Sequence, residues 1–397
     1  MEKIRIQELF REKKILKWIT ICLFAYGLVS VFMGVYRGAT GSMDFQWDSA
    51  KVLALRINPY LESLEPSGIW EQYDFGGSYG ALEANQFPSL LWLLVPFTVF
   101  TPQVANVVWA LFNLLCGAIF LWGLRQTFLE DLGKEEFLFT VAVFVSGTPL
   151  RNCLAMGQHT LFSMAFLLLA IVFARKEKRI LAGLFLSISY FKYVLVVPIA
   201  LYFIYKRWFK ELIISVIPHI VLTAFSAWWL QGSFMDMILQ PLEVSSKLAD
   251  QGAIDLGRWI GNGTASMAVA VLLGLALMLF IFFVPKGHDK ELITLLMLVS
   301  LILMYHRFYD FFILVVPMAL LLFNRESMIL EKVCVGMSVV ISYYIFSVFI
   351  HIWGLSGIQY EALTVVLAVF YYILTAVEFK NVIKLVLKGK KRSKGGE

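Results

Sequence analysis

The sequence is poor in charged residues, and this already restricts the class of protein. Only 16% of its 397 residues are charged and 59% are hydrophobic, whereas a soluble globular protein has about 25% charged and about 45–50% apolar residues. This balance excludes an ordinary soluble enzyme. At about 20 apolar residues per membrane-spanning helix, a chain of this length is mostly occupied by transmembrane helices.

Cysteines and acidic clusters are also scarce. The four cysteines, Cys22, Cys116, Cys153 and Cys334, lie in or beside apolar stretches and show no Cys-x-x-Cys spacing. Neither a disulfide framework nor a zinc site is indicated. No acidic cluster suits Mg²⁺ or Ca²⁺, so we predict neither a metal nor a cofactor.

The net charge of +6 does not indicate nucleic acid, because Lys and Arg mark the ends of apolar runs. Such basic clusters are typical of cytoplasmic loops in membrane proteins. Both termini are then expected inside, and the polar stretches 37–86 and 231–265 are expected to be extracytoplasmic loops. The whole chain, 1–397, is predicted to form one multi-pass domain with a basic cytoplasmic tail, 388–397.

The apolar runs predict an all-α integral membrane protein with about twelve spans. The predicted spans are 17–36, 104–124, 137–150, 158–174, 180–191, 193–206, 211–230, 266–285, 291–304, 308–323, 332–352 and 361–380. One more apolar run, 87–100, would reverse the charge pattern if it crossed. We interpret it as interfacial or re-entrant.

Two pairs of these spans are too short to cross a bilayer. The run 180–191 would form a helix about 18 Å long, against a hydrocarbon core of about 30 Å. Lys192, which follows it, is therefore expected inside the bundle. The pair 292–304 and 308–323 repeats this arrangement with His306 at its tip. Because ionisable residues at membrane depth normally face a protein cavity, both tips are predicted to point into one outward-facing cavity.

The first outer loop contains two acidic residues with different expected roles. The apolar spacing predicts a short surface helix from Asp48 to Leu55, ended by Asn58-Pro59. Asp48 is the better N-cap of that helix, which leaves Asp44 free to take a proton from a hydroxyl group. Loop aspartates are usually caps or solvated side chains, so spacing alone does not separate these interpretations of Asp44.

A series of short motifs runs through most of the chain. In order, they are Asp44-Phe45, Asn58-Pro59-Tyr60, Phe87-Pro88-Ser89-Leu90, Trp109 with Asn113, Gly157-Gln158, Lys192 and the segment from His306 to Pro317. In this order the chain resembles the GT-C fold membrane glycosyltransferases of family 87, which use polyprenyl-phosphate sugars and include bacterial mannosyltransferases.

The resemblance implies a single sugar on a polyprenyl phosphate, presented on the outer face of a bacterial cytoplasmic membrane, and inverting transfer to a glycan or glycolipid acceptor. In that family the Asp of the first outer loop is the proposed general base, and the late His lies in the active-site cavity. Asp44 and His306 match these positions and are the predicted catalytic residues. The predicted substrate-binding residues are Asp48, Asn58, Tyr60, Arg151, Gln158, His159, Lys192, Arg258 and Arg307.

The chemistry of such a transfer also accounts for the expected absence of a metal. A departing phosphate is an anion, and preorganised cations stabilise it strongly in a low-dielectric site. Four side chains at the outer ends of spans could supply this charge: Lys192, Arg151, His306 and Arg307. The expected partners are therefore the lipid-linked sugar, its acceptor and membrane lipids, without nucleic acid.

The sequence departs from the family pattern at four positions, and these put the substrate in doubt more than the reaction. Arg56 stands where Gly is frequent, Ser89 replaces a second Pro, Tyr193 follows Lys192 in place of Pro, and Met304 replaces a Trp.

Purely structural roles stay open for several of these residues. His306 and its neighbours could form a structural polar cluster, and Arg151, Gln158 and His159 could be helix-end contacts. Tyr60 belongs to an aromatic loop that fits either sugar stacking or an interfacial belt. Two other functions also remain: a polysaccharide polymerase or ligase, and a lipid-glycan transporter, although no inverted repeat is visible.

Overall fold

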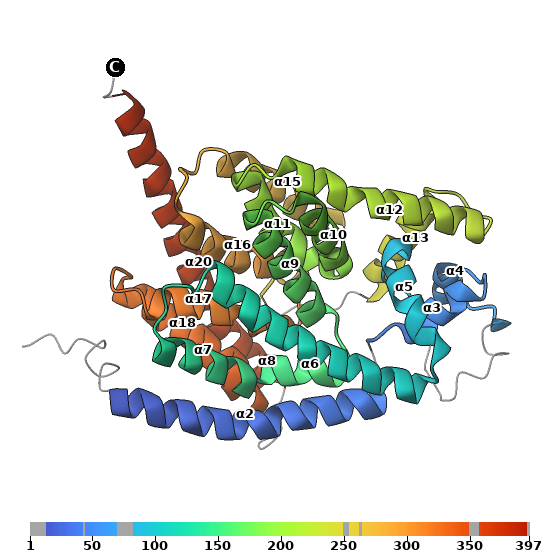
Figure 1. Cartoon of the computed structure of the whole chain (residues 1–397), viewed down its shortest axis with the longest axis horizontal. Coiled ribbons are helices and arrows are strands. Elements are labelled where there is room, and N and C mark those ends of the chain that lie inside the picture. Colours follow the sequence, from blue (N-terminus) through green and yellow to red (C-terminus); the bar gives the residue numbers. More distant parts are fainter. Residues whose placement is uncertain are drawn as a thin grey trace, which may run out of the picture.

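The computed structural model describes residues 13–42, 44–69, 82–248, 254–261, 264–348 and 357–394, and every element in these ranges is a helix. The helices form a bundle with a long α2 along one side and a group of short helices at one end (Figure 1). The all-α fold class is therefore confirmed.

The helices that form the bundle are α2 (Lys13–Gly41), α6 (Pro102–Thr127), α7 (Lys134–Ser146), α8 (Thr148–Met156), α9 (Thr160–Arg175), α10 (Arg179–Ser189), η3 (Tyr190–Lys192), α11 (Tyr193–Tyr205), α12 (Phe209–Trp229), α15 (Thr264–Ile281), α16 (Asp289–Leu303), η4 (Phe308–Leu314), α17 (Val315–Leu322), α18 (Ile329–Val340), the π-helix η5 (Ile341–Ile345), α19 (Phe346–Val348) and α20 (Gly357–Lys394). The short helices at one end are α3 (Trp47–Ala54), α4 (Pro59–Leu64), α5 (Pro88–Leu94), η2 (Val95–Val99) and α13 (Asp236–Leu248). A further short helix, α14 (Leu256–Ile260), packs against α15 and α20 of the bundle.

About twelve spans are not confirmed. Among the described residues, six helical stretches are long and apolar enough to cross a membrane, or seven if the bent pair α7–α8 is one span. One of the six, Arg179–Tyr205, consists of α10, η3 and α11, which fold back as a hairpin, so its length and composition do not make it a single crossing. The remaining predicted spans are shorter helices, such as α9 with 16 residues and α16 with 15. A helix of 16 residues is about 24 Å long, which is less than the hydrocarbon thickness of about 30 Å.

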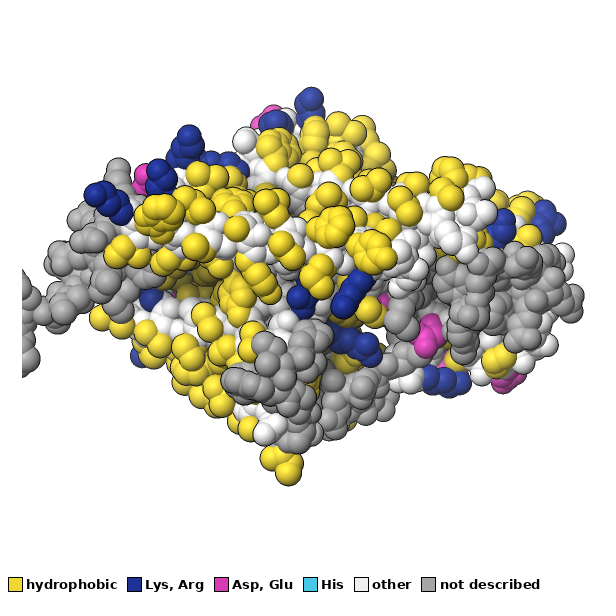
Figure 2. Space-filling model, turned by 90° about the horizontal axis from the view of Figure 1, so that it is seen from below, with side chains coloured by type: hydrophobic (Ala, Val, Ile, Leu, Met, Phe, Trp, Pro, Cys, Tyr) yellow, Lys and Arg dark blue, Asp and Glu magenta, His cyan; other side chains and the backbone are white. Residues whose placement is uncertain are grey.

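Helix α2 packs lengthwise against α7 and α8. A Cβ atom on Gly27 would lie 2.7 Å from Val145, and one on Gly38 would lie 2.2 Å from the carbonyl oxygen of Leu154. Helix α2 therefore approaches α7 and α8 too closely to carry a larger residue at Gly27 or Gly38. The other face of α2 carries exposed hydrophobic residues such as Trp18, and Figure 2 shows the broad apolar surface on this side. Such a surface is typical of contact with lipid.

Helices α10 and α11 form the expected short hairpin with Lys192 at its tip. The Phe128 ring contacts Arg175 at the end of α9 and Tyr202 late in α11, which places those ends together. Lys192 lies beside the start of α9, because its backbone N–H donates to Ser163 Oγ at 3.0 Å. The chain thus enters and leaves this hairpin at the same end of the bundle. We call the end with Lys192 the site end and the end with Arg175 the opposite end.

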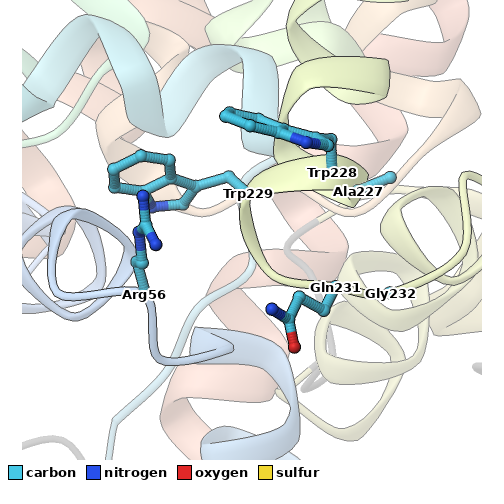
Figure 3. A pocket seen from close by; sticks show the side chains of 6 residues that line it. All are labelled: Arg56, Ala227, Trp228, Trp229, Gln231 and Gly232. Atoms are coloured by element: carbon cyan, nitrogen blue, oxygen red, sulfur yellow. The ribbon is translucent and has the colours of Figure 1, made fainter.

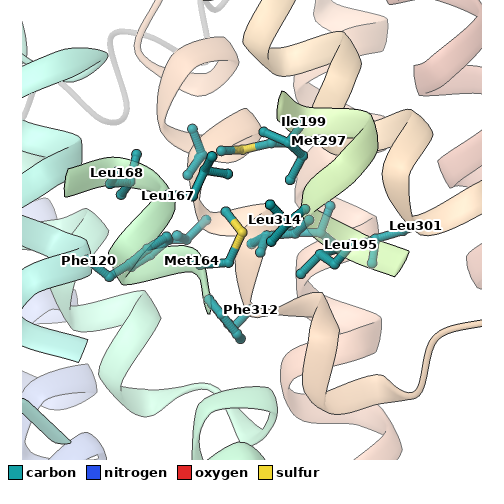
Figure 4. Packing of buried hydrophobic residues seen from close by; sticks show 14 of the residues in the cluster. Phe120, Met164, Leu167, Leu168, Leu195, Ile199, Met297, Leu301, Phe312 and Leu314 are labelled. Carbon is teal, nitrogen blue, oxygen red and sulfur yellow. The ribbon is translucent and has the colours of Figure 1, made fainter. Parts of the chain in front are cut away.

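A continuous apolar core holds the hairpins in place. Figure 4 shows side chains from α6, α9, α11, α16 and η4 meeting between the helices. Representative members are fully buried: Phe120, Met164, Leu195, Leu301 and Phe312. Because these residues interdigitate at close to crystal density, they fix the depth of both hairpin tips.

The short helices at the site end pack around a second, smaller core formed by Leu53, Tyr60, Ala84, Leu91, Ala227, Met237 and Val244. Two expectations about this region need correction. Helix α3 begins at Trp47, so Gln46 and not Asp48 is its N-cap residue. Asn58 begins α4, because its side-chain oxygen accepts from the backbone N–H groups of Tyr60 and Leu61.

Candidate active site

Asp44 lies at the site end, just after α2, and is held by the end of α8. Its backbone N–H donates to the carbonyl oxygen of Met156 at 2.9 Å. The Oγ atom of Ser42 donates to the same oxygen at 3.1 Å. The side chain of Asp44 accepts a hydrogen bond at Oδ2 from Nε2 of Gln158. Asp44 is therefore fixed at the backbone and at the carboxylate.

A glycine makes this arrangement possible. Gly157 ends α8 with φ at +67°, and a Cβ atom there would lie 1.7 Å from Oγ of Ser42. Only glycine adopts this left-handed conformation without a steric penalty. The carbonyl oxygen of Gly157 accepts from Nε1 of Trp109 at 2.8 Å. The turn brings Gln158 beside Asp44.

The electrostatic environment of Asp44 suits a base that must hold and release a proton. Burial raises the pKa of the Asp44 carboxyl above its usual range. The hydrogen bond from Gln158 and the positive charges of Lys192 and Arg307 act in the opposite direction and lower this pKa. Asp44 is thus a partly buried carboxylate with cations close enough to influence it.

Lys192 connects Asp44 to a second buried carboxylate. Its Nζ atom lies 3.5 Å from Oε1 of Gln158 and 4.0 Å from Oδ2 of Asp310. It also lies 5.2 Å from the centroid of the Tyr309 ring, within range of a cation–π interaction. The tips of the two short hairpins therefore meet. Gln158 bridges Asp44 and Lys192, since its amide donates to one and accepts from the other.

His306 and Asp310 form a buried pair in which both are 1% exposed. Nδ1 of His306 lies 2.9 Å from Oδ2 of Asp310, and Nε2 lies 3.1 Å from the carbonyl oxygen of Ser300. A carbonyl oxygen only accepts, so Nε2 carries a hydrogen. The hydrogen bond to Asp310 then requires one more proton, on Nδ1 or on the carboxyl group. Oγ1 of Thr160 donates to Oδ1 of Asp310 at 2.5 Å.

This pairing determines the charge of the whole cluster. An imidazolium with a carboxylate, or a neutral imidazole with a carboxylic acid, has no net charge. Lys192 and Arg307 contribute two positive charges and an ionised Asp44 contributes one negative charge. These five side chains therefore carry one excess positive charge, before any negative charge on the neighbouring Asp255 is counted. In a largely buried region an anion gains more from such a charge than in water.

His159 has a supporting place beside this cluster. Its ring stacks on Phe191 with centroids 4.7 Å apart, and Nε2 lies 3.2 Å from the carbonyl oxygen of Phe45. Phe45 in turn stacks on Trp109. These aromatic rings pack against one another next to Asp44, and His159 is buried among them, with 2% of its surface exposed.

The structure does not bring Asp48, Asn58 or Tyr60 into the cluster. Oδ1 of Asp48 accepts from the backbone N–H of Ser49 at 2.8 Å. Asn58 caps α4 and donates to Oε1 of Gln240 at 3.0 Å. Tyr60 is fully buried in the smaller core, and its hydroxyl donates to the carbonyl oxygen of Gln86 at 2.7 Å. Asn58 and Tyr60 thus join the short helices to one another, whereas the contacts of Asp48 stay within the first turn of α3.

Two of the predicted arginines also lie elsewhere. Arg151 on α8 donates from Nη2 to Oγ of Ser347 at 2.9 Å. Arg258 on α14 forms an ion pair with Glu361 at the start of α20. These contacts join helices that are far apart in the sequence.

Sequence reasoning did not identify Asp310 as a central residue, and it gave Asp255 no specific role. Asp310 lies four residues after His306, but His306 precedes η4, which begins at Phe308, so the spacing rule for side chains on one α-helix gave no signal for this contact. Asp255 precedes α14, is 1% exposed and interacts electrostatically with His306. Burial raises the pKa of the Asp255 carboxyl. Its proximity to His306 depends on tertiary packing and has no local sequence signal.

Within the described ranges, no group of three or more His, Cys, Asp or Glu side chains is placed to hold a metal ion. The carboxylates of Asp44 and Asp310 have a lysine between them, an arrangement suited to an anion more than to a cation.

Comparison with known proteins shows one family to which the chain is similar. The sequence model of glycosyltransferase family 87 matches residues 88–306, which is more than half of the chain and includes Gln158, Lys192 and His306. No curated protein and no solved structure matches the chain. Because this match covers more than half of the chain, the chain belongs to glycosyltransferase family 87.

Proposed function

We propose that this protein transfers one monosaccharide from a polyprenyl-phosphate donor to a hydroxyl group of a lipid-linked or cell-surface glycan. The observation that carries the proposal is the connection of Asp44 to Lys192 through Gln158, with Arg307 close by, at one end of an apolar bundle. A base and two cations are the groups that displacement of a sugar phosphate requires.

In the proposed reaction Asp44 accepts the proton of the acceptor hydroxyl. The acceptor oxygen then forms a bond to the anomeric carbon, and the bond from that carbon to the phosphate oxygen breaks. The electron pair leaves with the polyprenyl phosphate. A single displacement of this kind inverts the anomeric configuration, and the raised pKa of Asp44 favours uptake of the proton.

Lys192 and Arg307 would stabilise the departing phosphate. The excess positive charge of the cluster matches the negative charge of the donor, so we propose a transfer that needs neither metal nor cofactor. His306 would not transfer a proton in this scheme, because both of its ring nitrogens are engaged by protein groups. With Asp310 it is a positioning pair that fixes Lys192 and the hairpin tip.

The distribution of basic residues suggests how the protein is oriented in its membrane. Basic residues gather at the opposite end of the bundle, where Arg175 lies 3.3 Å from Glu130 and Lys206 lies 2.8 Å from Asp289. By the distribution of Lys and Arg, we propose that this end is cytoplasmic and that the active site faces outside in a bacterial cytoplasmic membrane. The transferred sugar would be a hexose or pentose, mannose included, in cell-envelope polysaccharide biosynthesis.

The test is sugar transfer by the purified, reconstituted protein from a panel of polyprenyl-phosphate monosaccharides, with cell-envelope lipids as the acceptor pool. Wild type, Asp44→Asn and Asp48→Asn are compared with and without chelator. We expect wild type and Asp48→Asn to transfer sugar both with and without chelator. We expect Asp44→Asn to transfer none.

Three results would contradict the proposal. Full activity of Asp44→Asn would remove the base assignment, and loss of activity on chelation would remove the metal-free mechanism. Transfer of an intact lipid-linked oligosaccharide instead of a monosaccharide would favour the polymerase or ligase alternative.

A further inference from the structure

A hollow of about 350 Å³ lies at the site end, apart from the Asp44 cluster. It is formed where the turn after α3 meets the turn after α12. The residues that line it are Arg56, Ala227, Trp228, Trp229, Gln231 and Gly232. Figure 3 shows the Arg56 guanidinium beneath the Trp229 indole, with Trp228 above and Gln231 on the far side.

The aromatic wall of this hollow is fixed in place. Nε1 of Trp229 donates to the carbonyl oxygen of Leu53 at 2.9 Å, which locks the indole against α3. The guanidinium carbon of Arg56 lies 4.0 Å from the centroid of the Trp229 ring. Stacking on an indole orients a guanidinium group while leaving its N–H donors at the edge available.

The backbone holds both polar side chains of the hollow in an unusual conformation. Arg56 has φ at 64° and Gln231 has φ at 53°, in the left-handed region that non-glycine residues seldom adopt. Each of these residues closes the helix that precedes it: the backbone N–H of Ile57 donates to the carbonyl oxygen of Val52, and that of Gly232 donates to the carbonyl oxygen of Ala227. A left-handed residue at this position is a common way to end a helix. The ends of α3 and α12 therefore place Arg56 and Gln231 beside the same hollow.

The chemistry of the hollow favours an anionic sugar. No acidic side chain lines it, and among the described residues no hydrogen bond engages the guanidinium of Arg56. Arg pairs with carboxylate or phosphate through two parallel hydrogen bonds. Trp228 is 68% exposed and offers a flat apolar face beside these donors. A saccharide that carries a carboxylate or phosphate satisfies both features.

The position of the hollow relates it to the transfer site. Asp44 precedes α3 and Arg56 follows it, and a helix of eight residues is about 12 Å long. The hollow and the proposed base therefore lie at opposite ends of one short, rigid element. An oligosaccharide can span this separation, whereas a single sugar cannot occupy both places.

We infer that the hollow at Arg56 and Trp228 is an acceptor subsite that binds an anionic sugar of the glycan, remote from the hydroxyl group that is glycosylated. This inference rests on the proposed function for the identity of the acceptor. The binding itself does not depend on catalysis and can be measured separately.

The experiment uses the full chain reconstituted in phosphatidylcholine vesicles and a matched pair of probes. Cellobiouronic acid carries a carboxylate, and cellobiose is its neutral counterpart. Titration calorimetry should show that wild type binds the charged disaccharide at least tenfold more tightly. Arg56→Gly should abolish this preference, because glycine tolerates the left-handed backbone and the side chain is therefore removed without backbone strain. Asp44→Asn should keep the preference.

Matched controls separate this effect from a general loss of charge or aromatic surface. Arg207→Gly removes an exposed arginine with φ at 58° from the turn between α11 and α12 at the opposite end, and it should bind like wild type. Trp228→Leu should weaken both probes. Trp18→Leu on α2, which removes another largely exposed indole, should not.

Equal binding of the two probes by wild type, or an unchanged preference in Arg56→Gly, would overturn the inference. Loss of the preference in vesicles that contain phosphatidylglycerol, measured at an ionic strength high enough to screen the surface charge of the vesicles, would identify a lipid headgroup as the occupant and would also overturn the inference. A preserved preference in a protein that transfers no sugar would contradict the proposed function and leave the anion site in place.

Discussion

The ammonium group of Lys192 lies 4.0 Å from the carboxylate of Asp310, and each residue occupies the tip of a different short hairpin. The contact joins the tips of the two hairpins, η3 and η4, at the same depth within the bundle. Because Asp310 also contacts His306 and Thr160, one buried carboxylate orients three side chains around the proposed leaving group.

Asp310→Asn should lower kcat/KM for the lipid-linked donor by about 10- to 100-fold, since hydrogen bonds to charged groups contribute about 1.5–3 kcal/mol. Lys192→Met should have a larger effect. If Asp310 acts by positioning Lys192, adding Asp310→Asn to Lys192→Met should change the donor kcat/KM by less than about threefold. Additive losses in this double-mutant cycle would assign Asp310 an independent role. Thermal unfolding of each variant provides the control for misfolding.

Asp44→Asn should reduce kcat by about 10²- to 10⁴-fold, the usual contribution of a general base. Donor binding should be retained, because Lys192 and Arg307 remain. Asp48→Asn is the matched control, as Asp48 bonds only to Ser49 among the described contacts. Single-turnover rates with saturating donor measure the effect. Equal losses in the two variants would argue against a base at position 44.

The pH profile should show an acid limb that belongs to Asp44. The ionised carboxylate is the active form, so kcat/KM should fall as the pH drops through a pKa above the usual aspartate range. Gln158→Met removes the hydrogen bond that lowers this pKa, and the limb should therefore move to higher pH. Asp48→Asn should leave the limb in place. A limb that moves to lower pH in Gln158→Met would contradict the assignment.

Gly157→Ala should impair both stability and transfer. An alanine in the left-handed conformation costs about 1–2 kcal/mol, and its Cβ would also collide with Ser42. The collision would displace Gln158 from Asp44. Gly336→Ala on α18 is the control, because a Cβ there meets no atom within 4 Å. We expect a lower unfolding temperature and weaker transfer in Gly157→Ala alone.

Much of the helical framework could be predicted from apolar runs and charge. The predicted span 104–124 lies within α6, and the turn at Lys192 appears where the shortness of 180–191 required it. The number of membrane crossings was harder to predict, because a count of apolar runs does not show where a helix bends. The break at Gly147, where α7 and α8 meet at 49°, divides a predicted span in this way. A Cβ on Gly147 would lie 2.5 Å from Tyr343, a contact invisible in local sequence.

The candidate site was predictable only in part. Asp44, Gln158, Lys192 and Arg307 were selected from loop position, from the shortness of two hairpins and from the family resemblance, and the structure places them together. Asn58 and Tyr60 were selected with them but stabilise the smaller core, because a polar or aromatic residue in a loop gives no indication of what it contacts. The partner of His306 likewise became clear only from its hydrogen bonds.

The hydrogen bond between Thr160 and Asp310 joins residues 150 positions apart, which has a consequence for synthesis. Chains emerge N-terminus first, at about 5–20 residues per second. Lys192 therefore reaches the membrane many seconds before its carboxylate partner exists. During this interval Lys192 lacks the carboxylate that lies 4.0 Å from it in the finished protein, and an unpaired charge at membrane depth is costly. We therefore expect quality-control proteases to act on the half-made protein. Truncation before η4 should shorten the lifetime of the protein in the cell as well as abolish its activity.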